Sequence, residues 1–233
     1  MACSKRLILC VPGVLRGGYL VFVLLLIVAA PVAAQSRRAS PPSDEPIVTF
    51  RPFFLLNGEA FAARQTFDAI FGRQSLRPFW GGGLQVGFWN RIFVELDASR
   101  FTENGQRVFV TSDGTIFPLN IPLDVRITTF ELAGGYRYPI VRRLWAYGAV
   151  GMTRDAYTET SSFAEAGENT DTSATGLAVL GGVEFRAHPW VSVAGEVAHT
   201  RVHGILGTGG ISQQFGEDSL GGNAIRLRIL VGR

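Results

Sequence analysis

The sequence predicts an all-β protein, an eight-stranded antiparallel up-and-down β-barrel that crosses a membrane. Three observations favour this class. Segments of strand length alternate apolar with polar residues, and Gly, Asn, Asp and Pro separate them. The connections between these segments alternate between long and short along the chain, as in bacterial membrane barrels. The first residues have the composition of a segment that directs export.

Residues 1–34 are predicted to be a cleaved secretory signal peptide. Lys5 and Arg6 precede an apolar run over 19–34, and small residues end that run. We therefore expect cleavage after Ala34. The alternative is a retained membrane anchor, since the apolar run is near the lower length limit for a membrane-spanning helix.

The rest of the chain is expected to have two parts. Residues 35–46 are polar and rich in Pro, which is typical of a flexible linker, and residues 47–233 form the predicted barrel domain. Cys3 and Cys10 both lie in the signal, so we expect no disulfide and no thiolate metal site in the mature chain. All charged residues of the signal are basic, and without them the mature chain is close to neutral. This composition argues against a nucleic-acid partner.

Eight runs have roughly the length of a transmembrane strand. Short connections follow the second, fourth and sixth runs, whereas long connections follow the others. Outer-membrane barrels have short periplasmic turns and long extracellular loops, so the long connections are expected outside the cell. The predicted strands lie near 47–59, 78–89, 91–102, 123–138, 143–155, 173–186, 190–202 and 220–232.

The two faces of most predicted strands differ in chemistry. In the last strand, Ile225, Leu227 and Ile229 alternate with Arg226 and Arg228. A transmembrane barrel places its apolar face towards lipid and its polar face inwards, the inverse of a soluble barrel. An eight-stranded barrel has an interior just wide enough for side chains to fill. We therefore expect an ion-pair network in the lumen made of Glu59, Glu95, Asp97, Glu131, Arg137, Glu184, Arg186, Glu196, Arg226 and Arg228.

The fourth predicted strand changes phase in its middle. Val125 and Ile127 occupy odd positions, whereas Phe130 and Leu132 occupy even ones. One extra residue in the strand would restore the alternation, which predicts a β-bulge near Thr128–Thr129.

Residues at the strand ends and in the long connections give further expectations. Trp89, Trp145 and Trp190 are expected in the aromatic girdles at the membrane interfaces. Within the first long connection, the segment 66–72 predicts either one helical turn that packs on the rim or an apolar patch that faces a partner or lipid. In the second, the segment 107–119 predicts a hairpin that extends two strands above the membrane.

This topology and alternation resemble the small outer-membrane barrels of the OmpA/OmpX type over residues 47–233. The resemblance implies an outer-membrane location, contact with outer-membrane lipid, a monomer, and a structural or surface-interaction role. The long loops would then meet an extracellular ligand or protein. Such barrels usually end in an aromatic residue that the assembly machinery reads, whereas this sequence ends in Arg233. The sequence does not indicate how its last strand is recognised for insertion.

Three other functions remain open at this point. A small gated pore is the second hypothesis, because rearranged ion pairs would open the lumen. A soluble lipocalin-like carrier would need an apolar lumen. A lipid esterase at the rim would need His, Ser and a carboxylate, but the segment with Glu196, His199 and Thr200 has Thr instead of Ser. The acidic loop 155–172 lacks the EF-hand spacing, so we expect no metal site there. We also expect no catalytic residue and no cofactor.

Overall fold

The computed structural model describes residues 47–111, 114–161 and 169–232, so the predicted signal and linker lie outside the described residues. Eight antiparallel strands form one closed barrel, in which each strand pairs with its neighbours in sequence and β1 pairs with β8. The predicted up-and-down topology is therefore confirmed. The strands are β1 Val48–Phe61, β2 Arg77–Phe88, β3 Ile92–Val110, β4 Ile116–Val141, β5 Leu144–Thr160, β6 Thr170–His188, β7 Val191–Arg201 and β8 Gly222–Val231.

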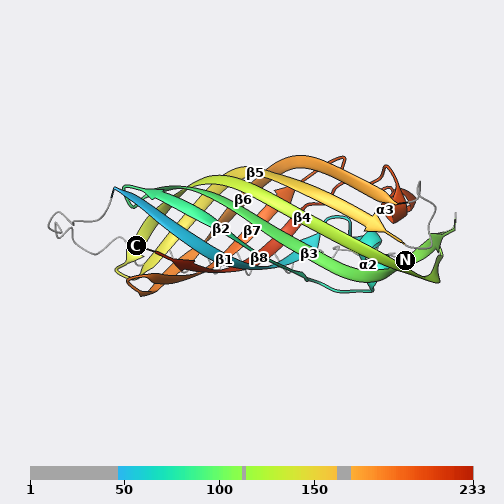
Figure 1. Cartoon of the computed structure of the whole chain (residues 1–233), viewed down its shortest axis with the longest axis horizontal. Coiled ribbons are helices and arrows are strands. Elements are labelled where there is room, and N and C mark those ends of the chain that lie inside the picture. Colours follow the sequence, from blue (N-terminus) through green and yellow to red (C-terminus); the bar gives the residue numbers. More distant parts are fainter. Residues whose placement is uncertain (1–46, 112–113, 162–168, 233) are drawn as a thin grey trace, which may run out of the picture. The chain divides into compact units, whose positions relative to one another are not determined.

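The two ends of the barrel differ (Figure 1). The short turns that follow β2, β4 and β6 lie at one end, and the helices α2 (Arg64–Phe71) and α3 (Gly210–Phe215) lie at the other. The helical turn predicted within 66–72 is confirmed by α2. None of the described helices has the length and apolar character needed to cross a membrane.

The strands extend further into the predicted long loops than the sequence indicated. β3 and β4 pair from Ile92 opposite Tyr136 to Val110 opposite Ile116, with a register shift between Gln106 and Val108. This pairing confirms the hairpin predicted over 107–119. Strands of 19 and 26 residues are much longer than the roughly 9–11 residues that a bilayer requires. The β3–β4 ribbon therefore projects beyond the membrane on the side of the long loops.

The outer wall of the barrel changes chemistry along the strands. Next to the short turns, the outward side chains are large and apolar, as with Leu96 on β3 and Leu132 on β4. Further along, the exposed outward side chains are Arg100 on β3, Arg126 on β4 and Arg154 on β5. Apolar side chains tolerate lipid, whereas arginine prefers the headgroup region or water. The arginines therefore mark the edge of the lipid-facing band on the side of the long loops.

The interior changes from polar at the level of the membrane to apolar above it. This change explains why the apolar residues of β4 move from odd to even positions along the strand. Val125 and Ile127 point into the barrel above the membrane, where the protein folds like a soluble barrel with an apolar interior. Phe130 and Leu132 point outwards at the level of the lipid. Pairing of β4 with β3 and β5 continues without a shift through Thr128–Thr129, so the predicted bulge is wrong. The change of environment accounts for the pattern, because the strand keeps one regular alternation throughout.

Arginine substitutions on β4 should reveal the edge of this band. We expect Leu132→Arg to lower the free energy of unfolding by about 2–4 kcal/mol, because it places a charge in lipid. Thr128→Arg, on the same outward face but opposite Arg100, should cost at most about 1 kcal/mol. Urea unfolding in lipid vesicles measures both values. Equal costs would contradict the assigned boundary.

Candidate functional site: the filled lumen

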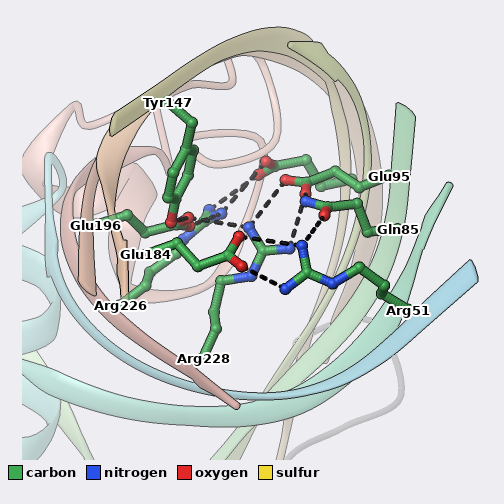
Figure 2. Close-up of polar contacts among 9 residues, drawn as sticks. Arg51, Gln85, Glu95, Tyr147, Glu184, Glu196, Arg226 and Arg228 are labelled. Carbon is green, nitrogen blue, oxygen red and sulfur yellow. Dashed lines mark hydrogen bonds and ion pairs between the residues drawn. The ribbon is translucent and has the colours of Figure 1, made fainter. Parts of the chain in front are cut away.

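Arg228 on β8 is the centre of a network of buried polar side chains inside the barrel (Figure 2). Its guanidinium group binds Glu95 of β3 through two hydrogen bonds, with Nη2–Oε2 2.7 Å and Nη1–Oε1 3.2 Å. The same Nη1 donates to Glu196 Oε2 of β7 at 3.0 Å. The guanidinium carbon also lies 4.0 Å from the ring centroid of Phe53. One side chain therefore connects β8 with the opposite wall and with the adjacent strand.

Arg226, two residues earlier on β8, makes a second set of ion pairs. Its Nη2 lies 2.9 Å from Glu131 Oε2 and its Nη1 3.2 Å from Glu131 Oε1, which is a bidentate pair. Nη1 also lies 3.4 Å from Glu196 Oε1. Tyr147 donates its hydroxyl proton to Glu196 Oε2 at 2.8 Å. Glu196 is thus shared between both arginines and one tyrosine.

A third arginine extends the network towards the short turns. Arg51 on β1 pairs with Glu184 on β6, and its Nη1 lies 3.1 Å from Glu184 Oε2. Its Nη1 also donates to Gln85 Oε1 at 3.3 Å, and Gln85 Nε2 donates to Glu95 Oε2 at 3.1 Å. Gln85 therefore joins the Arg51 pair to the Arg228 group. The lumen network defined in this way contains Arg51, Gln85, Glu95, Glu131, Tyr147, Glu184, Glu196, Arg226 and Arg228.

The alternation of the strands positions all of these side chains. A residue that faces inwards on a strand is followed two residues later by another, which places Arg226 and Arg228 on one face. Gly83 on β2 also faces inwards. A Cβ atom there would lie 2.7 Å from the Asp97 Cβ atom and 2.7 Å from the Phe53 ring, so glycine leaves the space that these side chains occupy.

Six of the ten residues predicted to line the lumen belong to this network, and four do not. Asp97 is buried beside Glu95 and Glu131, and carboxylate oxygens of the three lie within 4.8 Å of one another. Glu59 lies opposite Ala224 near the end of the lumen that faces the long loops. Arg137 and Arg186 lie at the end with the short turns, where both guanidinium groups pack on the Trp145 ring.

The residues expected in the lumen did not include three members of the network, Arg51, Gln85 and Tyr147. All three occupy inward positions on their strands, so the alternation of inward and outward residues could have identified them. Gln85 and Tyr147 are both uncharged, so a search for ion pairs does not select them. The hydrogen bonds of these two residues show that the network depends on neutral donors as well as on ion pairs.

Trp145 differs from the expectation that it belongs to an interfacial girdle. It occupies an odd position on β5, as do the inward residues Tyr147 and Ala149, and it therefore faces the barrel interior. Trp89 and Trp190 are exposed at the short turns. Their assignment to an interfacial girdle stays a prediction, whereas the inward orientation of Trp145 follows from the alternation of β5.

A second layer closes the barrel at the end that faces the long loops. It is a cluster of buried apolar side chains, called the apolar plug below, and the helix α2 contributes Phe67 and Ile70 to it. Phe101 on β3 stacks on Phe79 with ring centroids 5.3 Å apart, and Phe61 stacks on Phe67 at 4.2 Å. The buried members are Ala63, Phe67, Ile70, Phe79, Phe101, Val108, Leu123, Val125, Ile127, Tyr157, Val202, Ile205, Leu206, Ile211 and Leu220.

Polar contacts hold the long connections onto this plug. Glu217, in the connection between β7 and β8, accepts hydrogen bonds from the backbone N–H of Thr66 at 2.8 Å and from its hydroxyl at 2.7 Å. Arg77 pairs with Glu103 at 3.0 Å and donates to the Gly72 carbonyl at 2.8 Å. The first and last long connections are therefore joined to each other and to the barrel wall.

The residues considered for an esterase do not converge. Glu196 and Thr200 are buried on the inward face of β7, whereas His199 is exposed on the outward face. His199 Nδ1 lies 3.0 Å from Asn223 Oδ1 of the neighbouring strand. A catalytic triad requires its histidine within hydrogen-bond reach of the carboxylate and the nucleophile. The alternation of β7 places His199 on the outer side of the barrel wall and Glu196 and Thr200 on the inner side.

Comparisons with solved structures give several outer-membrane barrels of low sequence identity. Ail, the attachment invasion locus protein of Yersinia pestis, in complex with the heparin analogue sucrose octasulfate, is 12% identical. The alignment covers 79% of this chain and 95% of Ail, with a TM-score of 0.46. Neisserial surface protein A is 10% identical, with 80% and 97% covered and a TM-score of 0.48. The N-terminal barrel of OprF from Pseudomonas aeruginosa is 9% identical, with 78% and 97% covered and a TM-score of 0.45. A comparison with curated protein sequences found no match.

The closed eight-stranded ring, the apolar outer band and the charged interior define a small transmembrane β-barrel. Residues 20–228 match the outer membrane protein beta-barrel domain family, and the chain belongs to that family. The protein is therefore located in the outer membrane. A soluble carrier is excluded by this location.

Proposed function

We propose that this protein is a closed, non-enzymatic and monomeric outer-membrane barrel, whose lumen does not conduct and whose loops make contacts outside the cell. The two layers of filling carry this proposal. The lumen network occupies the section of the barrel at the level of the membrane, and the apolar plug occupies the section above it. An ion that crossed the barrel would have to displace both.

The extracellular side supports a role in contacts with an outside ligand or protein. The β3–β4 ribbon carries exposed apolar side chains on both strands, among them Phe109, Phe117 and Leu119. Exposed apolar groups that lie together are typical of interaction sites. The backbone N–H of Val110, at the tip of the ribbon, donates to Gln214 Oε1 of α3 at 3.0 Å, which ties the tip to the helix of the last long connection. A ribbon that is held near its tip presents these groups with little entropic cost on binding.

The runner-up function is a small gated pore, and conductance separates the two. Because an ion would have to displace both the lumen network and the apolar plug, we expect the purified protein to show no steady openings in planar lipid bilayers. A porin reconstituted in the same way is the positive control, and heat-modifiable gel mobility verifies that the inserted protein is folded. Steady openings by the folded protein would contradict the proposal and favour the pore.

A further inference from the structure

A cavity of about 570 Å³ lies at the end of the barrel with the short turns, beyond the Arg51–Glu184 pair. Residues from all three turns line it, so it faces the periplasm. Its described lining contains no Asp or Glu. The basic side chains that line it are Arg51, Arg137, Arg142, Arg143, Arg186 and His188.

The basic cavity contains more arginines than the carboxylates of the lumen network pair with. Arg51 is paired with Glu184. Arg142 and Arg143 form the exposed β4–β5 turn, and Arg186 packs with its guanidinium carbon 5.8 Å from the Trp145 ring centroid. Within the part of the chain that the structure describes, these last three arginines form no ion pair with a carboxylate. A concave wall with charge of one sign concentrates counter-ions.

Neutral donors in the same cavity also lack partners. Thr49 Oγ1 and Trp145 Nε1 are both buried, and neither has a hydrogen-bond partner in the described structure. Buried polar groups of this kind normally bind another group or a ligand. His188 Nδ1 accepts a hydrogen bond from the Trp190 backbone N–H at 3.4 Å, so in the neutral ring Nε2 carries the proton and is a donor.

A glycine keeps the space beside these donors open. Gly87 on β2 lies directly opposite Thr49 on β1. A Cβ atom at Gly87 would lie 2.5 Å from Thr49 Oγ1 and 2.7 Å from Arg137 Nη2. A larger residue at position 87 would collide with the Thr49 hydroxyl and the Arg137 guanidinium group, so glycine keeps the space beside them open.

We propose that the basic cavity binds a phosphate group from the periplasmic side. Guanidinium groups bind phosphate oxygens through paired hydrogen bonds, and Thr49 and Trp145 would supply neutral donors to the remaining oxygens. The group belongs either to a soluble phosphate compound or to the headgroup of a phospholipid in the inner leaflet. This site is separate from the extracellular contacts proposed above and does not depend on them.

Pyrophosphate is a suitable probe, because it presents the phosphate chemistry without a lipid chain. The folded mature protein in an uncharged detergent is titrated with pyrophosphate by calorimetry and by tryptophan fluorescence. Sodium chloride at matched ionic strength controls for general screening. We expect saturable binding of pyrophosphate and none of chloride. Equal responses to both salts, or no saturable response, would overturn the proposal.

Variants locate the site. Arg142→Gln with Arg143→Gln should weaken pyrophosphate binding about tenfold or more, and Thr49→Val should weaken it severalfold through loss of one hydroxyl. Arg100→Gln with Arg126→Gln makes the same change of charge on the outer wall and should leave the affinity unchanged. Gel mobility verifies the fold of each variant. Cavity variants that bind as tightly as the unchanged protein would refute the assignment.

Nanodiscs distinguish the two sources of the phosphate group. If the cavity takes a lipid headgroup, nanodiscs of phosphatidylglycerol should weaken pyrophosphate binding by competition relative to the protein in an uncharged detergent that contains no phosphate. If it takes a soluble compound, the affinity should be the same in both. Either outcome supports a phosphate site, provided that the variant with Arg142→Gln and Arg143→Gln weakens the binding about tenfold or more in each medium.

Discussion

Replacement of Arg228 by methionine is expected to lower the free energy of unfolding by about 3–5 kcal/mol. Arg228 is 2% exposed and binds both Glu95 and Glu196. Methionine fills a similar volume but leaves these carboxylates buried without their shared cation. Removal of one partner of a buried ion pair is more costly than replacement of the whole pair, because the remaining charge is uncompensated. Urea unfolding in detergent micelles measures the loss.

Arg201→Met is the matched control. Arg201 lies on the adjacent strand β7, but it is exposed on the outer wall, where its Nε contacts His203 Nε2. The same substitution there should change the stability by no more than about 0.5 kcal/mol. Equal effects of the two substitutions would show that the lumen network contributes nothing specific to stability.

A second substitution separates loss of charge balance from loss of packing. Glu95→Gln in the Arg228→Met background removes one of the two carboxylates that the first change leaves without their cation. Because the uncompensated charge is then smaller, we expect part of the lost stability to return. If the double variant is less stable than Arg228→Met alone, lost hydrogen bonds rather than buried charge dominate the cost.

The strand pattern predicted the barrel because the lipid-facing band imposes one simple rule on every strand. Above the membrane the rule is reversed, because apolar residues face inwards and polar residues face outwards. A sequence does not show where the membrane ends. Val125 and Ile127 therefore suggested a bulge, although β4 is regular at that position. The transition can be read only when neighbouring strands are aligned, since Arg100 lies opposite Thr128 and Arg154 opposite Phe130.

The sequence predicts some of the ion-pair partners but not those that face each other across the lumen. Parity selects the inward residues, and adjacency of β7 and β8 places Glu196 near Arg226 and Arg228. Contacts across the lumen depend on strand tilt and stagger, which no single strand encodes. The pairs of Arg228 with Glu95 and of Arg51 with Glu184 are of this kind, since neither pair joins neighbouring strands of the barrel.

The apolar plug was the least predictable part, because much of it comes from connections rather than strands. Val202, Ile205 and Leu206 follow β7 in a segment without alternation, yet all three are buried. Their burial depends on α2 and α3, which are short helices that lie over the end of the barrel. A segment of this length has no helical stability of its own in water, and only packing onto the barrel fixes it.

Phe101→Ala tests this plug, and we expect it to lower the free energy of unfolding by about 3–5 kcal/mol. Phe101 is 2% exposed, and its ring contacts those of Phe61, Phe71 and Phe79. Phe109→Ala is the matched control on the same strand, where the side chain is 52% exposed, and its effect should be well under half as large. Similar losses for both would mean that the plug is not tightly packed.

Conductance of the Phe101→Ala variant then separates the roles of the two layers. The substitution removes a ring from the apolar plug but touches no member of the lumen network, whose ion pairs lie in the section at the level of the membrane. The barrel should therefore stay closed in planar bilayers even though its stability falls. Openings in this variant but not in the unchanged protein would assign the closure to the plug and leave the lumen network as a path that ions can cross.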